Sequence, residues 1–279
     1  MDFTHRHVNV GEVSLHIAEA GDPSKPLVVF LHGFPEFWYS WRHQLEALAK
    51  AGYWCVAPDL RGYNDSDKPE GVESYALEKL VGDVAGLIGA LGREKAHVVG
   101  HDWGAIIAWA FAQQRPELLE KLAILNVPHP VAFQRGIRTA KQLFKSWYMF
   151  FFQIPWLPEK AIAAFDYRAL RQGFPSFSRE DQDRYVAAMA TPGARTATIA
   201  YYRSIIRRFF RGDLPKPTRI EAPVLVIWGD RDAFLGVELA EPPPEWVPNA
   251  RVVHVPEASH WVQNDAPERV NELLLSFLG

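Results

Sequence analysis

The pentapeptide Gly100-His101-Asp102-Trp103-Gly104 lies where a buried strand is predicted to turn into a buried helix. The apolar run Ala96-His97-Val98-Val99 precedes it, and Ala105-Ile106-Ile107-Ala108-Trp109-Ala110-Phe111-Ala112 follows. So sharp a turn needs glycine on both sides of the turning residue, because a side chain there would collide with neighbouring backbone. Gly100 and Gly104 meet that need. The stretch therefore predicts a nucleophile elbow that carries aspartate where serine is commoner.

Asp102 has two interpretations. Aspartate is a favoured N-cap residue, so the side chain would simply cap the following helix. The context Gly-x-Asp-x-Gly between a buried strand and an apolar helix favours a nucleophile instead, and the helix N-terminus would keep its carboxylate ionised. A carboxylate that attacks an alkyl carbon becomes an ester on the enzyme. Turnover then requires a base that activates water, and donors that hold the oxyanion.

Histidine is the natural base at neutral pH, and the chain has ten. His260 is our predicted base because it follows the last predicted strand, at the carboxyl edge of the sheet; His129, at the start of a helical insertion, is its rival. Asp232 is the predicted orienting acid, although Asp230 remains open because it also fits a turn position. The order nucleophile, acid, histidine is that of the α/β-hydrolase triad.

Two backbone groups are predicted to form the oxyanion hole. The N–H of Trp103 directly follows the nucleophile, and the N–H of Phe34 lies in the turn His32-Gly33-Phe34-Pro35 after a buried strand. Asn126, at the end of another predicted strand, is an amide and so does not compete with Asp232 as the acid.

The order of predicted strands and helices indicates an α/β fold with a mostly parallel central sheet, helices on both faces and an inserted helical cap. A hairpin is predicted within 8–17, after which strands and helices alternate up to about residue 126. We expect a core of residues 1–128 and 218–279 and a cap of residues 129–217, which lies over the carboxyl edge of the sheet. The closing helix is expected to begin near Asp265, with Glu268 completing a capping box.

Composition narrows the class of protein further. The 279 residues carry 30 Lys and Arg against 33 Asp and Glu, so the net charge of −3 predicts no binding to nucleic acid or to an anionic membrane. The basic cluster from Arg203 to Arg211 is read as a solvated helix face. Cys55 is single and cannot form an internal disulfide. With no signal-peptide or membrane-spanning pattern, we expect a cytoplasmic protein acting on a small molecule without metal or cofactor.

These motifs together resemble the epoxide hydrolases of the α/β-hydrolase superfamily. The resemblance is carried by the elbow and by three further stretches, which are His32-Gly33-Phe34-Pro35-Glu36, Asp59-Leu60-Arg61-Gly62-Tyr63 through Ser66-Asp67-Lys68-Pro69, and Gly229-Asp230-Arg231-Asp232. It implies conversion of an epoxide to a vicinal diol: the aspartate opens the ring from behind while two cap tyrosines hold the epoxide oxygen. Tyr148 resembles the first of these and Tyr202 the second, with Tyr201 an adjacent alternative.

The substrate is expected to be a small apolar epoxide. Trp103, Phe34, Trp147 and Phe151 are the predicted substrate-binding residues. Aromatic residues elsewhere in the cap are expected to enlarge the same apolar pocket, namely Phe150, Phe152, Trp156 and Phe165. The sequence leaves the oligomeric state open.

Three alternatives keep the same fold. A haloalkane dehalogenase would share the aspartate and histidine, but Phe34 stands where its halide-binding asparagine is expected. A fluoroacetate dehalogenase resembles the chain in Phe34-Pro35-Glu36 and Arg61-Gly62-Tyr63, but tends to carry arginine at the place of Trp103. A non-catalytic receptor is less consistent with a complete set of Asp102, Asp232 and His260.

Overall fold

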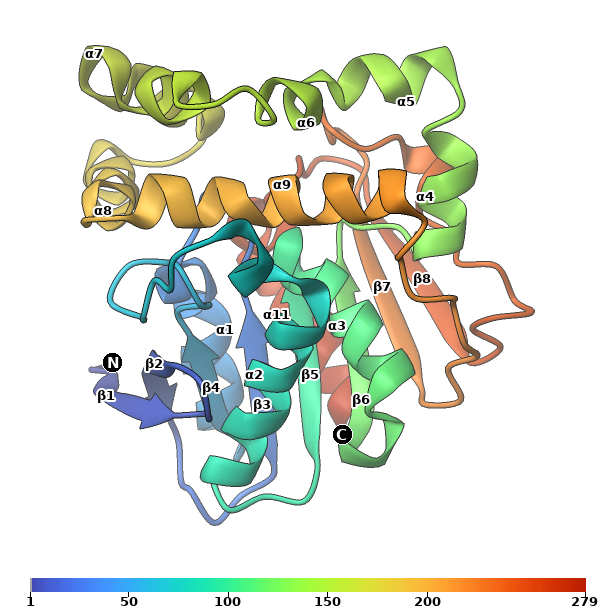
Figure 1. The fold of residues 1–279 in the computed structure, drawn as a ribbon. Coiled ribbons are helices and arrows are strands. Elements are labelled where there is room, and N and C mark those ends of the chain that lie inside the picture. The colour runs from blue at the N-terminus through green and yellow to red at the C-terminus, as the bar shows by residue number, and fades with distance from the viewer. Residues whose placement is uncertain (1) are drawn as a thin grey trace.

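Eight strands form one sheet in the order β1-β2-β4-β3-β5-β6-β7-β8 in the computed structural model, which describes residues 2–279 (Figure 1). The strands are β1 Thr4–Asn9, β2 Ser14–Ala20, β3 Leu27–Leu31, β4 Trp54–Pro58, β5 Ala96–His101, β6 Leu119–Leu125, β7 Val224–Gly229 and β8 Ala250–Val255. Strands β1 and β2 pair antiparallel, as does β2 with β4, and every other pairing is parallel. The predicted hairpin and mostly parallel sheet are confirmed.

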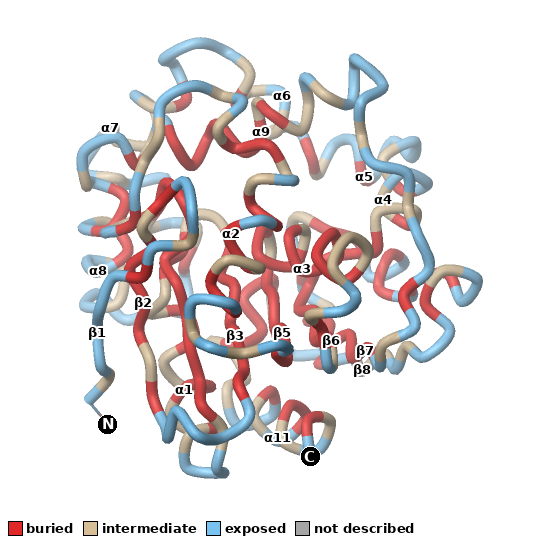
Figure 2. Tube along the Cα trace, turned by 60° about the horizontal axis from the view of Figure 1, so that its bottom comes forward, coloured by how far each residue is buried: buried red, intermediate tan, exposed pale blue. Residues whose placement is uncertain are grey.

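The central strands are buried along their whole length. Every residue of β3, β4, β5 and β7 is buried, whereas β1 at the sheet edge exposes all but one of its residues. A parallel strand covered by helices on both faces needs apolar side chains on both faces, which is why these segments read as continuous apolar runs. Figure 2 shows this buried centre beneath exposed loops.

Helices cover both faces of the sheet. On one face α1 (Arg42–Lys50) and α11 (Pro267–Leu278) share an apolar cluster with the strands, and on the other face α2 (Leu77–Ala90) and α3 (Trp103–Gln114) do so. Shorter helical segments are η1 Trp38–Trp41, η2 Val72–Tyr75, η3 Pro116–Leu118, η4 Val237–Leu239 and α10 Val262–Asp265. Helix α3 lies behind the elbow and is buried on nearly all sides, so the turn before it has a rigid support.

Six helices lie between β6 and β7. They are α4 Pro130–Gly136, α5 Ala140–Lys145, α6 Trp147–Phe151, α7 Leu157–Gly173, α8 Arg179–Ala190 and α9 Ala194–Arg211. Helix α7 is interrupted at Ala164–Tyr167, where the backbone is not helical. Figure 1 shows α9 lying across the carboxyl ends of the central strands, with α5, α6 and α7 forming an outer layer above it. These six helices are called the cap below.

The start of the closing helix differs from our prediction. Helix α11 begins at Pro267 and its N-cap residue, Ala266, makes no side-chain cap. Asp265 ends α10 instead, and its carboxylate accepts hydrogen bonds from the N–H of Ser259 at 2.9 Å and from Ser176 Oγ at 2.8 Å. The capping box of Asp265 and Glu268 is therefore wrong. Proline at the first helical position presets φ and has no N–H that needs a partner.

Candidate active site

The elbow turns as tightly as its sequence predicts. Asp102 stands between β5 and α3 with φ at 48°, in the left-handed region that L residues rarely adopt. A Cβ atom on Gly100 would lie 2.5 Å from the carbonyl oxygen of Gly104, and one on Gly104 would lie 2.0 Å from that of Leu31. Both distances are far below van der Waals contact. Only glycine therefore fits at positions 100 and 104. The close approach of the backbone at these two residues presents the Asp102 carboxylate at the edge of the sheet.

The Asp102 carboxylate faces away from its own helix. It makes no side-chain hydrogen bond to α3, which removes the helix-cap interpretation. Oδ1 accepts a hydrogen bond of 2.6 Å from the N–H of Phe34, and Oδ2 lies 3.6 Å from His260 Nε2. Burial alone would raise the pKa of Asp102, but the contact and charge of His260, with the N–H of Phe34, bring it below its ordinary value. The group is an anion with one oxygen held by backbone.

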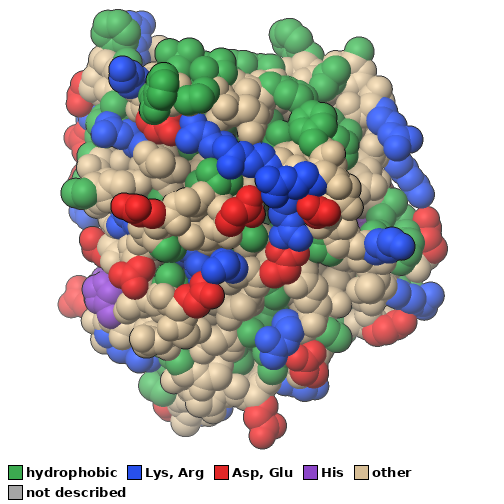
Figure 3. All heavy atoms as spheres, in the orientation of Figure 1, with side chains coloured by type: hydrophobic (Ala, Val, Ile, Leu, Met, Phe, Trp, Pro, Cys, Tyr) green, Lys and Arg blue, Asp and Glu red, His purple; other side chains and the backbone are tan. Residues whose placement is uncertain are grey.

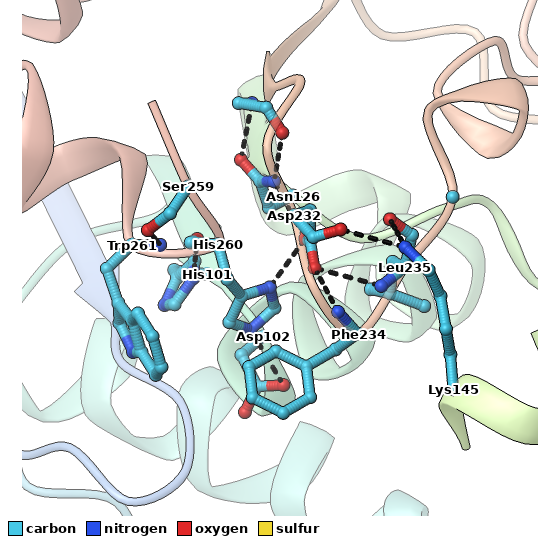
Figure 4. Close-up of polar contacts among 12 residues, drawn as sticks. His101, Asp102, Asn126, Lys145, Asp232, Phe234, Leu235, Ser259, His260 and Trp261 are labelled. Carbon is cyan, nitrogen blue, oxygen red and sulfur yellow. Dashed lines mark hydrogen bonds and ion pairs between the residues drawn. The ribbon is translucent and has the colours of Figure 1, made fainter. Parts of the chain in front are cut away.

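His260 lies between two carboxylates (Figure 4). Its Nδ1 is 2.7 Å from Asp232 Oδ2, and its Nε2 faces Asp102 across 3.6 Å. Burial opposes protonation of the ring, but the two carboxylates outweigh burial and raise the pKa of His260 to about 10. In the resting protein His260 is therefore an imidazolium.

Asp232 is held by four donors. Oδ2 accepts from Asn126 Nδ2 at 2.8 Å as well as facing His260, and Oδ1 accepts from the N–H groups of Phe234 at 2.7 Å and Leu235 at 2.9 Å. Burial raises its pKa, but the charge and hydrogen bond of His260 and these donors lower the pKa below its ordinary value. Asp230 turns away and contacts His254 Nδ1 at 2.6 Å. The geometry thus brings Asp232, and not Asp230, to His260.

His129 does not reach the site. Its Nδ1 accepts from the N–H of Val131, its Nε2 contacts Gln113, and its ring packs edge-on against Trp109. Burial lowers the pKa of His129 to about 4, so the ring is neutral. Its role in the described structure is to cap α4.

A buried pair behind the elbow escaped the sequence reasoning. Glu36 Oε2 lies 2.7 Å from His101 Nδ1 and accepts from the N–H of Gly33, while His101 Nε2 donates to the carbonyl oxygen of His260 at 2.8 Å. The pair therefore joins the turn that carries Gly33, the elbow and the loop that carries His260. Burial would raise the pKa of Glu36, but His101 and its hydrogen-bond donors hold it below its ordinary value. The sequence did carry a sign of this pair, because Glu36 and His101 are ionisable residues that follow two predicted buried strands.

The two predicted tyrosines converge, and Tyr201 does not join them. The rings of Tyr148 and Tyr202 are 5.9 Å apart, and that of Tyr202 lies 5.5 Å from Phe34 and 5.0 Å from Trp103. Burial raises the pKa of both phenols, and the nearby Asp102 carboxylate raises it further, so both stay protonated. Tyr201 is also buried, but its hydroxyl donates to the carbonyl oxygen of Arg61 at 2.7 Å.

The apolar lining is narrower than predicted. Phe34 and Trp103 lie against Tyr202, and buried Phe152 joins them at 4.9 Å from the same ring. Trp147 is 60% exposed and so does not line this surface, whereas half-buried Phe151 contacts Trp147 on one side and packs behind Phe152 on the other.

Three other aromatic residues assigned to the pocket point to solvent. They are Phe150, Trp156 and Phe165. The cause is that α6 and α7 form the outer layer of the cap, so only one face of each can look toward the core. Phe234, which was not predicted, instead packs 5.2 Å from His260 and 5.8 Å from Tyr148.

Helix α5 of the cap holds the loop that carries Asp232. Lys145 Nζ donates to the carbonyl oxygen of Asp232 at 2.8 Å (Figure 4). Gln142 Nε2 donates to the carbonyl oxygen of Phe234, also at 2.8 Å. Gln142 Oε1 accepts in return from the N–H of Gly236. Helix α5 of the cap and the loop from Asp232 to Gly236 are therefore joined by hydrogen bonds.

Two kinds of feature are absent from residues 2–279. No group of three or more His, Cys, Asp or Glu side chains is arranged to hold a metal ion. In the same part of the chain, every helix is too short or too polar to cross a membrane.

The fold and this site define an α/β hydrolase. Residues 26–267 match the family model of the alpha/beta hydrolase fold. The AB hydrolase superfamily protein YfhM of Bacillus subtilis is 43% identical over 97% of this chain and 96% of that protein. Epoxide hydrolase 4 of Mus musculus is 42% identical over 99% of this chain and 79% of that protein.

A solved structure agrees with these relatives. The crystal structure of Bacillus megaterium epoxide hydrolase in complex with an inhibitor is similar to this fold with a TM-score of 0.90 and 35% identity, over 98% of this chain and 99% of that one. The chain belongs to the epoxide hydrolases of the α/β-hydrolase fold family. The fold and the family predicted from the sequence are confirmed.

Asp230 and Asp232 lie in the same loop after β7 and allow a matched test. Asp232→Asn removes a negative charge 2.7 Å from His260 and should lower the pKa of His260 by roughly 1–3 units. Asp230→Asn should leave it unchanged, because Asp230 contacts His254. The measurement is an NMR titration of the histidine ring nitrogens; equal shifts in both variants would contradict the assignment.

The same change should alter stability against pH. The pKa of His260 is raised in the folded protein, so its stabilising effect is complete below the ordinary histidine pKa of 6.5 and is lost as pH rises through about 10. Asp232→Asn should weaken this loss, as measured by urea unfolding across that pH window, whereas Asp230→Asn should retain it.

Proposed function

We propose that this protein hydrolyses an epoxide to a vicinal diol through an ester formed on Asp102. The observation that carries the proposal is the position of one carboxylate between a backbone donor, Phe34, and an imidazolium, His260. Tyr148 and Tyr202 form the opposite wall, and the similar proteins named above support the substrate class.

Asp102 is prepared to attack without general-base help. Its lowered pKa keeps it ionised, and because Oδ1 is bound to the N–H of Phe34, Oδ2 is the oxygen left to attack carbon. As the carbon–oxygen bond of the epoxide breaks, the protonated phenols of Tyr148 and Tyr202 donate to the departing oxygen, and one of them passes it a proton. A halide leaving group would need no such proton.

Ester formation changes the state of His260. The high pKa of His260 depends on two carboxylates, and the ester removes the charge of one. The pKa of His260 therefore falls, and the imidazolium returns its proton to the tyrosinate left by the first step. Neutral His260, held by Asp232, is then the base for the second step.

Hydrolysis of the ester closes the cycle. His260 takes a proton from water, and the hydroxide attacks Cγ of Asp102. The N–H groups of Phe34 and Trp103 stabilise the oxyanion, and a donor of this kind commonly contributes about 100-fold to 1000-fold in rate. Collapse of the tetrahedral intermediate expels an alkoxide, which takes the proton of the Asp102 carboxyl group and so becomes the second hydroxyl of the diol. Ionised Asp102 is thereby restored beside protonated His260.

We further propose that residues 129–217 act as a cap domain over a core of residues 1–128 and 218–279. The wall formed by Phe34, Trp103 and Phe152 suits a small apolar substrate, since it presents aromatic surface around the reacting oxygens. In the proposed cycle water is the second reactant, and the protein's own side chains supply every proton-transfer group.

The substrate class is tested by parallel assays of purified protein with an aryl epoxide, a haloalkane and fluoroacetate. We expect diol from the epoxide and no halide or fluoride release, because the phenols are placed to protonate oxygen. Release of halide or fluoride without diol formation would replace the proposal with a dehalogenase activity, and binding without turnover would indicate a receptor.

The ester is tested by one turnover in ¹⁸O-labelled water with enzyme in excess over epoxide. The label should appear in Asp102, found by mass spectrometry of the peptide, and not in the diol. His260→Gln should accumulate the alkylated enzyme after a single turnover, whereas His129→Gln should continue to turn over. Label found only in the diol would rule out the covalent route.

Adjacent tyrosines provide a matched pair for the first step. Tyr202→Phe should slow ester formation by roughly 100-fold, because it removes a donor to the departing oxygen. Tyr201→Phe should form the ester at the normal rate, because its hydroxyl is bonded to Arg61. Rapid-quench measurement per folded protein separates the two; equal slowing by both changes would contradict the assignment.

A further inference from the structure

The charge of the chain is divided unevenly between the cap segment and the rest. Residues 129–217 contain 15 Lys and Arg against 6 Asp and Glu, a net charge of +9, whereas the remaining residues contain 15 against 27, a net charge of −12. The two add to the −3 of the whole chain. The near-neutral total that predicted no anionic partner therefore hides a strongly basic segment.

The cap also carries almost all of the exposed large hydrophobic side chains. Of eleven such residues within 2–279, ten belong to the cap and eight of these lie between 143 and 165. Among the eight, Phe144, Trp147, Trp156 and Phe165 are 60–87% exposed. Figure 3 shows hydrophobic side chains along the upper edge of the molecule, where Figure 1 places α5, α6 and α7, with a band of Lys and Arg below that edge.

Several cations beside these aromatic residues lack an acidic partner. Arg203 is bound to Glu159 and Arg208 to Glu78, so part of the basic cluster on α9 is used within the fold. Arg138, just before α5, and Lys160 and Arg168 on α7 are exposed and form no ion pair within residues 2–279. The outer layer thus exposes aromatic rings along α5–α7, with free cations just before α5 and on α7.

We propose that this outer layer of the cap docks on the surface of an anionic lipid bilayer. Tryptophan and phenylalanine insert at the boundary of head groups and acyl chains, and Lys and Arg are attracted to anionic lipids. The cap supplies both kinds of group on one surface. The docking is peripheral, since no helix of residues 2–279 is long and apolar enough to span a membrane.

Charge and chemistry favour this occupant over two others. A second copy of the chain docking cap to cap would bring two segments of net charge +9 together, at an electrostatic cost. A nucleic acid would satisfy the cations, but the surface also exposes aliphatic Leu143, Ile154 and Leu157, which neither stack on bases nor bind phosphate. A bilayer surface accommodates the aromatic, the aliphatic and the cationic side chains together.

Vesicle sedimentation tests the proposal with the purified full chain. The protein should bind vesicles of phosphatidylcholine mixed with phosphatidylserine, bind poorly to phosphatidylcholine alone, and be released by high salt. Arg138→Gln/Lys160→Gln/Arg168→Gln should lower the partition coefficient about 100-fold, because each cation near such a surface contributes a factor of about five. Phe144→Gln/Trp156→Gln/Phe165→Gln should lower binding at every salt concentration, because it removes the inserting rings.

The core provides matched controls. Val237→Gln and Arg251→Gln change one exposed apolar and one exposed basic residue outside the cap and should bind vesicles like the parent. Epoxide turnover in solution should be the same in all variants, since none touches the candidate active site. Absence of binding to anionic vesicles, unchanged binding by both cap variants, self-association seen in sedimentation velocity, or tighter binding to an oligonucleotide would each overturn the proposal.

Discussion

The site depends on one buried arrangement, an imidazole between two carboxylates. A buried charge is costly unless it is paired and hydrogen-bonded, so His260, Asp102 and Asp232 stabilise one another only as a set. Backbone donors complete the set: Phe34 holds Asp102, and Phe234 and Leu235 hold Asp232. Each donor belongs to a loop at the carboxyl edge of the sheet. The strands must therefore end in register for the charges to be tolerated.

A second buried pair holds those loops in fixed positions relative to one another. Glu36 and His101 connect the turn of Gly33, the elbow and the carbonyl oxygen of His260. None of these bonds reaches the Asp102 carboxylate itself. Their effect is to fix the backbone from which Asp102 and His260 project. The proposed mechanism requires these two side chains to be placed to within a fraction of an ångström.

The sequence predicted the features that follow from local sterics and strand order. Gly100 and Gly104 determine the elbow because any Cβ would collide with backbone. The ends of strands determined where Asp232 and His260 would meet. The directions of side chains on cap helices depend on how those helices pack, which sequence periodicity does not give, so Trp147 was assigned to the pocket and Phe234 was missed. The role of Asp265 was misjudged because a distant residue, Ser176, competes for it.

Helix α5 imposes a limit on how the protein admits a substrate. Lys145 and Gln142 bind the same loop that positions Asp232, so a cap that lifted at α5 would pull the acid away from His260. Helix α8 is attached to the core as well, because Tyr39 Oη donates to Asp181 at 2.9 Å and the ring of Tyr185 packs 5.3 Å from that of Phe37. The cap is therefore fastened to the core at both of its ends, and a cap that lifted as a whole would have to break both attachments.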